Sequence, residues 1–175
     1  MTEDIDKGLR ELLQRGDADA WPTLYAQLGA SLYSVARSMT SNRTDAEDAV
    51  QQAFLELYRS RDSFARAARP RAYAFTVLHH CAIRIRQRSA RSETVELTEE
   101  LAGVEAQVGL DEQDPRLEAA LAALPDEQRD VLALRIDGEL TFAEIGAALG
   151  VSEDTVASRH RRALEKLRER LGRIR

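Results

Sequence analysis

The stretch TFAEIGAALGVSEDTVASRHRRA, residues 141–163, decides the fold of the C-terminal part of this chain. Thr141 and Glu144 have the spacing of a capping box that opens a helix, and Gly150 supplies the left-handed residue that ends it. Ser152 then has the position of the N-cap of a second helix, which carries hydroxyl groups and arginines. A short helix, a tight turn and a second, basic helix are typical of a helix-turn-helix that enters the major groove of DNA. The alternative is a helical hairpin with a solvated basic face.

The rest of the sequence also has helical periodicity. Apolar residues recur at helical spacing over 21–39, and Thr44 with Glu47 forms a second capping box that would open the next helix. A basic loop is expected over 59–70, before a further helix that runs from about Pro70 to Arg91. We therefore predict an all-α protein with a short N-terminal helix (1–16), a helical domain (17–91), a flexible acidic linker (92–113) and a helix-turn-helix domain (114–175).

The formal net charge of −5 conceals an uneven distribution. Residues 61–91 hold eight arginines against one aspartate, and residues 152–175 hold eight basic residues against four acidic ones. Residues 92–124, in contrast, hold nine acidic residues against one arginine. Because the local potential governs contact with phosphates, the two basic segments favour nucleic-acid binding although the chain as a whole is acidic.

Composition and spacing argue against several other classes of protein. The sequence lacks the run of about 18 apolar residues that a membrane helix needs and the apolar core of a signal peptide, so we expect a cytoplasmic protein without membrane insertion. On a helix, His79, His80 and Cys81 would point about 100° apart and could not converge on one metal ion. No phosphate-binding glycine loop or catalytic motif stands in the sequence, and we therefore expect no catalytic residues, no metal and no cofactor.

Taken together, these segments resemble the extracytoplasmic-function sigma factors of bacterial RNA polymerase. DAEDAVQQAFLELY (45–58) resembles the family's helix that binds core polymerase, and RAYAFTVLHHCAIRIRQR (71–88) resembles the helix that melts and reads the minus-ten promoter element. Residues 124–171 resemble the domain that binds the minus-thirty-five element. The resemblance implies a two-domain protein without catalytic activity that joins core RNA polymerase to promoter DNA, and whose relatives are often inhibited by an anti-sigma factor.

The resemblance also implies which residues would make the contacts to polymerase and to the minus-ten element. The polymerase contacts would be Asp45, Glu47, Asp48, Gln51 and Phe54. From the residues alone, the alternative is that these acidic side chains are solvated and stand in the first turn because the helix dipole favours negative charge there. The minus-ten contacts would be Arg61, Phe64, Arg66, Arg69, His80, Arg84 and Arg88. Arginines beside an aromatic suit unstacked bases, although Phe64 fits a place in the core equally well.

In the helix-turn-helix, the implied DNA contacts are Thr155, Ser158, Arg159, Arg161 and Arg162, with Arg161 expected to touch phosphate alone. The sequence departs from the family pattern in the minus-ten helix. His80 and Arg84 stand where the family usually has Asn and Asp, and Gln87 stands where it usually has an arginine. The minus-ten sequence preference therefore does not follow from the resemblance.

Two other functions fit the residues alone. A helix-turn-helix regulator that acts without polymerase would bind duplex DNA by itself and would dimerise on palindromic sites. A helical adaptor would use its basic segments to bind an acidic protein partner. Titration of promoter DNA with and without core polymerase separates these functions from that of a sigma factor.

Overall fold

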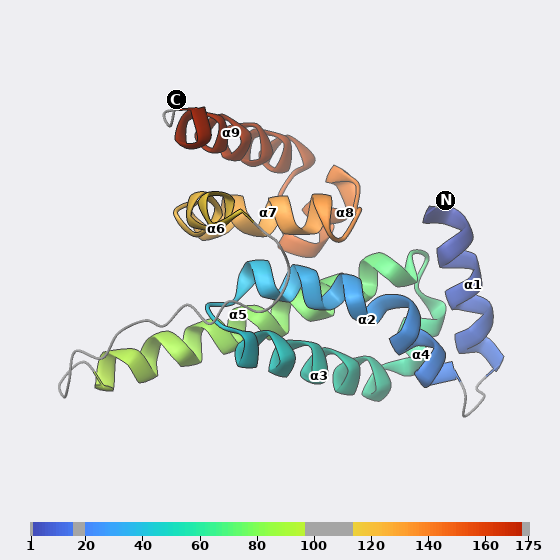
Figure 1. The fold of residues 1–175 in the computed structure, drawn as a ribbon. Helices are drawn as coiled ribbons and strands as arrows, with labels where there is room; N and C mark the ends of the chain where they lie inside the picture. The colour runs from blue at the N-terminus through green and yellow to red at the C-terminus, as the bar shows by residue number, and fades with distance from the viewer. Residues whose placement is uncertain (1, 16–19, 97–113, 173–175) are drawn as a thin grey trace.

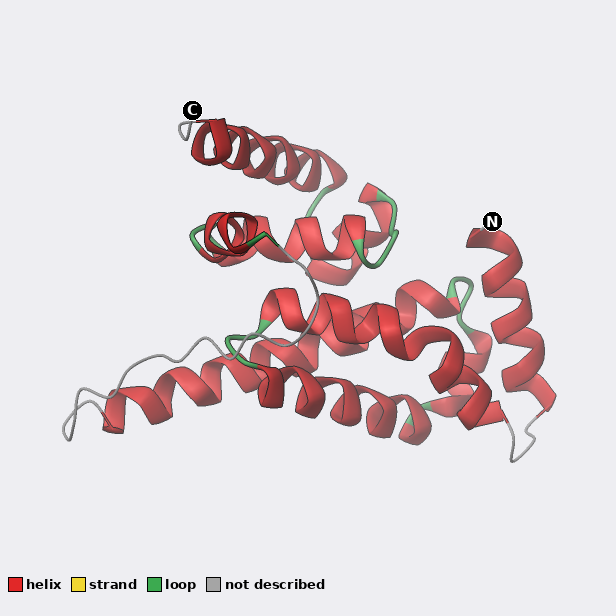
Figure 2. Ribbon diagram, in the orientation of Figure 1, coloured by secondary structure: helices red, strands yellow, loops and turns green. Residues whose placement is uncertain are grey.

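The computed structural model describes residues 2–15, 20–96 and 114–172, and the regular structure in these ranges is α-helical (Figures 1 and 2). The helices up to residue 96 form an N-terminal unit: α1 (Thr2–Arg15), α2 (Ala20–Met39), α3 (Arg43–Arg59), α4 (Arg61–Arg66) and α5 (Pro70–Glu96). The remaining helices form a C-terminal unit: α6 (Pro115–Ala122), α7 (Asp126–Ile136), α8 (Phe142–Leu149) and α9 (Glu153–Gly172). The predicted all-α class is confirmed.

The core of the N-terminal unit lies where α2, α3 and α5 pack against one another. Leu28 and Leu32 of α2 are buried there together with Phe75 and Leu78 of α5. Cys81 also lies in this core. Its thiol is free, and the side chain packs as a small apolar residue. Each helix therefore buries one apolar face and leaves its polar face on the surface of the unit.

The start of α3 differs from the sequence-based prediction. The N-cap is Asn42, whose side-chain oxygen accepts a hydrogen bond of 2.8 Å from the amide of Asp45. The predicted capping box of Thr44 and Glu47 does not form, because Glu47 instead pairs with Arg43 one turn earlier at 2.7 Å. Asn is at least as good an N-cap as Thr, and the i,i+4 ion pair occupies the glutamate.

Two other boundaries also differ. The predicted basic loop over 59–70 contains the short helix α4, and α5 continues to Glu96, beyond the expected end at Arg91. The rest of the predicted acidic linker, 97–113, lies outside the described residues. A segment of arginines and small residues gave no periodic signal by which so short a helix could be predicted.

The two units are packed together. Figure 1 shows α7 and α8 lying over α2 and α5, with α9 on the outer side of the C-terminal unit. The buried core is continuous across this boundary, because Val131, Leu134 and Ile145 of the C-terminal unit belong to the same cluster as Val35 and Leu78. This arrangement brings the helix-turn-helix against the helix that carries the first basic segment.

Candidate nucleic-acid interface

The helix-turn-helix forms with the caps that the sequence predicts. The hydroxyl of Thr141 accepts a hydrogen bond of 3.2 Å from the Glu144 amide, while the Glu144 carboxylate accepts one of 2.8 Å from the Thr141 amide. Gly150 ends α8 in the left-handed region with a φ of 67°. Ser152 caps α9 by accepting a hydrogen bond of 3.2 Å from the Thr155 amide. Together these caps fix where α9 leaves the turn.

The turn between α8 and α9 is tight enough to require glycine at a second position. The carbonyl oxygen of Gly146 accepts a hydrogen bond of 3.0 Å from the Val151 amide. A Cβ atom on Gly146 would lie 2.8 Å from the Val151 carbonyl oxygen, which is closer than van der Waals contact allows. Gly146 therefore lets the backbone of α8 touch the turn that positions α9.

The predicted DNA contacts of α9 fall into two groups. Arg161 and Arg162 are exposed and point away from the core, whereas Thr155 and Ser158 are half-buried. The Thr155 hydroxyl is bonded to Ser152 at 2.9 Å. Arg159 is directed back toward α7, where its guanidinium pairs with the Glu127 carboxylate at 2.7 Å. Arg159 is thus bound to α7 by an ion pair, whereas Arg161 and Arg162 extend from α9 away from α7.

His160 lies beside Phe142, with 5.2 Å between the two ring centroids, and the guanidinium of Arg135 lies 5.2 Å from the same Phe142 ring. Burial, with a smaller effect from the positive charge of Arg135, lowers the pKa of His160 below its ordinary value of 6.5. The surroundings therefore favour the neutral form of His160, which joins α9 to α8 as an aromatic packing residue.

Phe64 is a core residue and does not reach a DNA surface. It has no exposed area and stacks on Tyr73 at 5.7 Å between ring centroids. The expectation that Phe64 contacts an unstacked base is therefore wrong for this structure, because α4 turns the ring inward. The other predicted residues of this segment remain at the surface: Arg61, Arg66 and Arg69.

The predicted stripe on α5 lies along α3. His80 is exposed, but Arg84 donates a hydrogen bond to the Glu56 carboxylate and Arg88 pairs with Asp48 at 3.6 Å. The hydrogen bond that Arg84 donates to Glu56 also raises the pKa of the Arg84 guanidinium. These two arginines remain largely exposed, so the acids of α3 hold them in place without covering them.

The predicted polymerase contacts on α3 differ in exposure. Asp45 is buried, where it accepts hydrogen bonds from the side chains of Asn42 (3.2 Å) and Ser89 (2.9 Å), so its expected place on a binding surface is wrong. The other predicted contacts remain accessible: Glu47, Asp48, Gln51 and Phe54. Asp45 links α3 to α5, which sequence spacing alone could not show.

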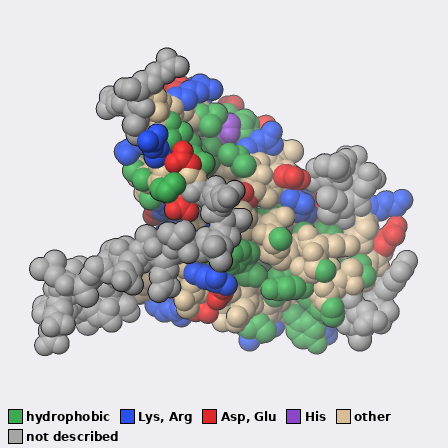
Figure 3. Space-filling view, viewed as in Figure 1, with side chains coloured by type: hydrophobic (Ala, Val, Ile, Leu, Met, Phe, Trp, Pro, Cys, Tyr) green, Lys and Arg blue, Asp and Glu red, His purple; other side chains and the backbone are tan. Residues whose placement is uncertain are grey.

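Sequence analysis also missed an apolar surface on α2 and α3. Tyr25 and Tyr58 are 60% and 52% exposed, and Leu55 is 47% exposed. The ring of Tyr25 packs on Phe54 at 5.1 Å, so this surface continues the predicted polymerase-binding face. Figure 3 shows hydrophobic side chains at the surface over α3. Helical periodicity places such residues on an apolar face, but it does not tell which part of that face stays uncovered.

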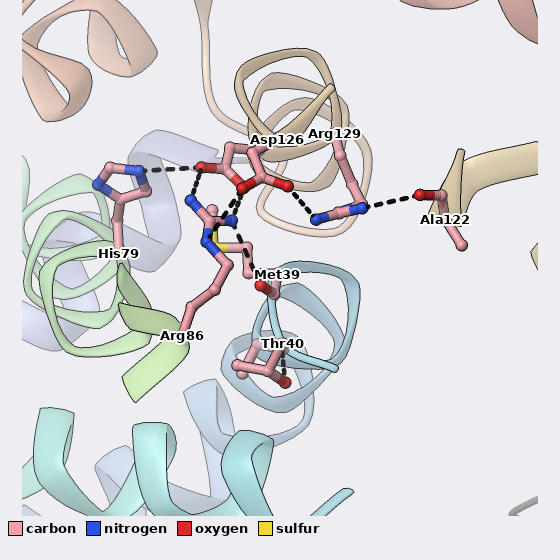
Figure 4. Close-up of polar contacts among 9 residues, drawn as sticks. Met39, Thr40, His79, Arg86, Ala122, Asp126 and Arg129 are labelled. Carbon is pink, nitrogen blue, oxygen red and sulfur yellow. Dashed lines mark hydrogen bonds and ion pairs between the residues drawn. The ribbon is translucent and has the colours of Figure 1, made fainter. Parts of the chain in front are cut away.

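A group of polar residues between the two units was likewise not predicted. Asp130 of α7 is buried, and its carboxylate lies 3.4 Å from His79 Nε2 and 3.1 Å from Arg86 Nη1. Figure 4 shows Arg86 between Asp126 of α7 and the backbone of Met39. We call these residues the inter-unit ion cluster: His79, Arg86, Asp126 and Asp130.

The described residues contain no group of histidine, cysteine and acidic side chains that could hold a metal ion. Each described helix is also too short or too polar to span a lipid bilayer.

Comparison with known proteins agrees with this architecture. Residues 24–92 match the sigma-70 region 2 family, and residues 120–169 match sigma-70 region 4. The chain is 31% identical to the RNA polymerase sigma factor CarQ of Myxococcus xanthus, over 94% of this chain and 96% of that protein. It is 28% identical to the ECF RNA polymerase sigma factor SigK of Mycobacterium ulcerans, over 95% of this chain and 93% of that protein.

A solved structure has the same arrangement of helices. The sigma factor RpoE of Bartonella quintana, in complex with the anti-sigma factor NepR, matches with a TM-score of 0.69 and 28% identity. The match covers 90% of this chain and 100% of that one.

Proposed function

Because this chain belongs to the extracytoplasmic-function sigma factors of RNA polymerase, we propose that its two helical units divide promoter recognition between them. As a member of this family it binds core RNA polymerase and directs transcription initiation at specific promoters. The N-terminal unit reads and melts the minus-ten element, and the C-terminal unit reads the minus-thirty-five element. The polymerase supplies the chemistry of transcription, and the sigma factor acts with it in the cytoplasm.

The observation that carries this assignment is the capped helix-turn-helix with Arg161 and Arg162 pointing outward from α9. The N-terminal residues of a recognition helix reach base edges, and residues further along approach the phosphates. Thr155 and Ser158 lie in the N-terminal part of α9, and Arg159 joins them when Glu127 releases it. Arg161 and Arg162 supply charge to the backbone of the DNA.

The minus-ten surface is made of the basic side chains that remain exposed around α4 and α5. These residues are Arg61, Arg66, Arg69, His80, Arg84 and Arg88. Arginines grip the backbone and stack on unpaired bases, which suits a single strand better than a closed duplex. Tyr58, under the guanidinium of Arg61 at 5.6 Å, offers an exposed aromatic ring at the same end of the unit.

Polymerase binds along the outer face of α3 through Glu47, Asp48, Gln51 and Phe54. This face combines apolar area with acidic side chains, which favours a partner surface that is apolar and basic. The Bartonella quintana relative is solved in complex with an anti-sigma factor. An anti-sigma factor that bound the exposed apolar area of this chain would compete with polymerase for it.

The test is promoter binding with and without core polymerase. A fluorescent promoter fragment should bind the chain specifically only when core polymerase is present. Specific binding by the chain alone would favour a helix-turn-helix regulator, and specific binding under neither condition would favour the adaptor.

A matched pair of variants then tests the recognition helix. Arg162→Ala should weaken holoenzyme binding across promoter sequences and reduce the salt dependence by roughly one phosphate contact. Arg168→Ala removes an exposed arginine further along α9 and serves as the control. Equal losses in the two variants would contradict the assignment of this surface.

A further inference from the structure

The N-terminal helix α1 contributes none of the proposed DNA or polymerase contacts, but it is anchored in the N-terminal unit. Leu9 is fully buried in the core, and Leu12 and Leu13 pack against that core from the same helix. α1 contacts both α4 and α5, and Figure 1 shows it at the end of the unit where α4 leads into α5. It therefore lies beside residues 67–69, which connect those two helices and which we call the α4–α5 turn.

The start of α5 takes its cap from α1. The Arg69 carbonyl accepts the first hydrogen bond of the helix, 3.0 Å from the Tyr73 amide, which makes Arg69 the N-cap residue. An arginine side chain has donors only, so it cannot accept a hydrogen bond from the amides of the first turn. Asp6 of α1 fills this role, because its Oδ1 atom accepts a hydrogen bond of 2.9 Å from the Arg71 amide. A negative charge is also favoured at a helix N-terminus.

A second residue of α1 holds the other side of Arg69. Arg10 donates a hydrogen bond of 2.7 Å to the Ala68 carbonyl. Asp6 and Arg10 are four residues apart and share one face of α1, so together they join this helix to the backbone on both sides of Arg69. Because the backbone groups of a short turn lie outside the helical ladder, these two side chains satisfy them and determine how the turn runs.

The charge of Asp6 also acts on the Arg69 side chain. The Asp6 carboxylate is buried, and its Oδ2 atom has no hydrogen-bond partner among the described residues. Arg69 Nη1 lies 3.8 Å from that oxygen, and Arg69 Nε lies 3.9 Å from the Glu144 carboxylate. The Arg69 side chain is nevertheless 49% exposed. Arg69 is thus oriented by two carboxylates and still presents half of its side chain to solvent.

We propose that Asp6 and Arg10 are positioning residues for the minus-ten contact of Arg69. α1 fixes the backbone of the α4–α5 turn, so that Arg69 meets the phosphates of an unpaired DNA strand in one orientation. A side chain that is ordered before binding loses less entropy on binding, and α1 thereby raises affinity without a DNA contact of its own. This role of α1 rests on the proposed minus-ten surface, whereas its two hydrogen bonds to the backbone do not depend on it.

Amide hydrogen exchange in the full chain tests the cap without any DNA. Asp6→Ala removes the acceptor, whereas Asp6→Asn keeps an oxygen in its place, and asparagine is about as good an N-cap as aspartate. The Arg71 amide should exchange about threefold to tenfold faster in Asp6→Ala than in the native chain, which is the effect of one lost cap, and Asp6→Asn should remain close to native. Unchanged exchange in Asp6→Ala would overturn the role of Asp6.

Binding by the holoenzyme then tests positioning on two DNA fragments, one with the minus-ten element unpaired and one duplex with the minus-thirty-five element alone. Asp6→Ala and Arg10→Ala should bind the unpaired fragment about threefold to tenfold more weakly, as expected for one lost contact, and the duplex as tightly as the native chain does. Asp6→Asn should restore binding to the unpaired fragment. Equal losses on both fragments, or no rescue by Asp6→Asn, would overturn the proposal.

Lys7→Ala and Glu11→Ala are the matched controls, since each removes one exposed charge from the same helix, and both should bind the two fragments as the native chain does. Arg10 is only half-buried, so Arg10→Ala tests the proposal even if Asp6→Ala does not fold, and circular dichroism verifies helicity for each protein. Losses in the controls as large as those in the variants would overturn a specific role for Asp6 and Arg10.

A double-mutant cycle tests whether α1 acts through Arg69. If it does, Asp6→Ala added to Arg69→Ala should weaken binding to the unpaired fragment no further than Arg69→Ala alone. Losses that simply add would overturn the proposal. Native holoenzyme that binds equally well after the minus-ten sequence is scrambled would contradict the proposed function itself, and that failure would appear before any residue is substituted.

Discussion

Phe64 shows how one side chain can serve the fold where the sequence suggested a role in binding. It is fully buried, close to Trp21 and stacked on Tyr73. We predict that Phe64→Ala lowers the free energy of unfolding by about 3–5 kcal/mol, because it leaves a cavity in the core. Urea unfolding measures this loss. Arg66→Ala, two residues later and exposed, should leave stability nearly unchanged and weaken promoter binding instead; the reverse pattern would restore a DNA-binding role to Phe64.

His160 gives the C-terminal unit a defined pH dependence. Its pKa is lowered in the folded state by burial and by Arg135, so the unfolded chain binds the proton more tightly. The contribution of neutral His160 to the free energy of unfolding is therefore fully present above the ordinary pKa of 6.5. This contribution declines as the pH falls through that value. Unfolding free energies measured between about pH 5 and 8 should show this decline, and His160→Gln should flatten it. An equally steep decline in the variant would assign the effect to other groups.

At the scale of single residues, the sequence predicted the types of side chain better than their positions in the folded chain. The exposed positions of Arg161 and Arg162 follow from their spacing on a regular helix. The burial of Asp45 does not, because its partner Ser89 lies on α5, far away in the chain. Helical periodicity describes one helix at a time. It therefore carries no information about a side chain, such as that of Asp45, that is buried by a contact with a second helix.

For the helical elements, the turn of the helix-turn-helix depends on Gly146. We predict that Gly146→Ala weakens the C-terminal unit by about 1–3 kcal/mol, because the added Cβ would overlap the Val151 carbonyl and force the turn apart. Promoter binding by the holoenzyme should fall further than stability requires, since α9 is displaced.

A glycine in open space provides the control for that substitution. Gly8 in α1 has no atom within 4 Å of its virtual Cβ, so Gly8→Ala should stabilise the chain by up to about 1 kcal/mol through helix propensity. Thermal unfolding compares the two variants. Similar effects of both substitutions would mean that helix propensity alone, and not the turn, determines the outcome at Gly146.

The recognition helix carries a further prediction at Arg159. Its ion pair with Glu127 is largely exposed on the glutamate side, so Arg159→Ala should change stability by no more than about 1 kcal/mol. If Arg159 swings out to a guanine, the variant should lose about 1–3 kcal/mol of discrimination at one position of the minus-thirty-five element. Holoenzyme binding to single-base promoter variants measures this, and an unchanged sequence profile would leave Arg159 as a residue that positions α9.

The sequence predicted the ends of a helix well where the expected capping residues form the capping hydrogen bonds in the structure. Thr141, Glu144 and Gly150 act as expected, and the capping hydrogen bonds form although Arg69 also lies 3.9 Å from the Glu144 carboxylate. At α3 the same pattern of Thr44 and Glu47 failed, since Asn42 and Arg43 offered the better cap and the better ion pair. A capping signature therefore depends on the residues just before it as much as on its own spacing.

For the whole molecule, the shared core predicts cooperative unfolding. The buried cluster runs from α2 and α5 into α7 and α8, so neither unit keeps its full core when the other unfolds. Calorimetry of the native chain should show a single transition whose calorimetric and van't Hoff enthalpies agree. Arg86→Gln should separate this into two transitions. Two transitions in the native chain would show that the units fold independently.

The placement of the two units was beyond prediction from the sequence. The contacts that fix it join Arg86 to Asp130 and Arg71 to Gly138, residues that share no local pattern and lie on either side of the acidic segment. Composition foretold two basic segments and an acidic one between them. It could not foretell that the helix-turn-helix would pack against the helix of the other basic segment.

The inter-unit ion cluster has a consequence for the supply of polymerase. A partner that binds only when the two units are apart has its affinity reduced by the fraction of molecules in which they are apart. If one molecule in about a hundred has its units apart, binding weakens about a hundredfold, or by roughly 2.7 kcal/mol. Where several sigma factors compete for a limited amount of core polymerase, the fraction of each factor that is able to bind determines how much polymerase it captures. Substitutions at Arg86 or Asp130 would then raise or lower the abundance at which the regulon switches on, without altering a single contact to polymerase or promoter.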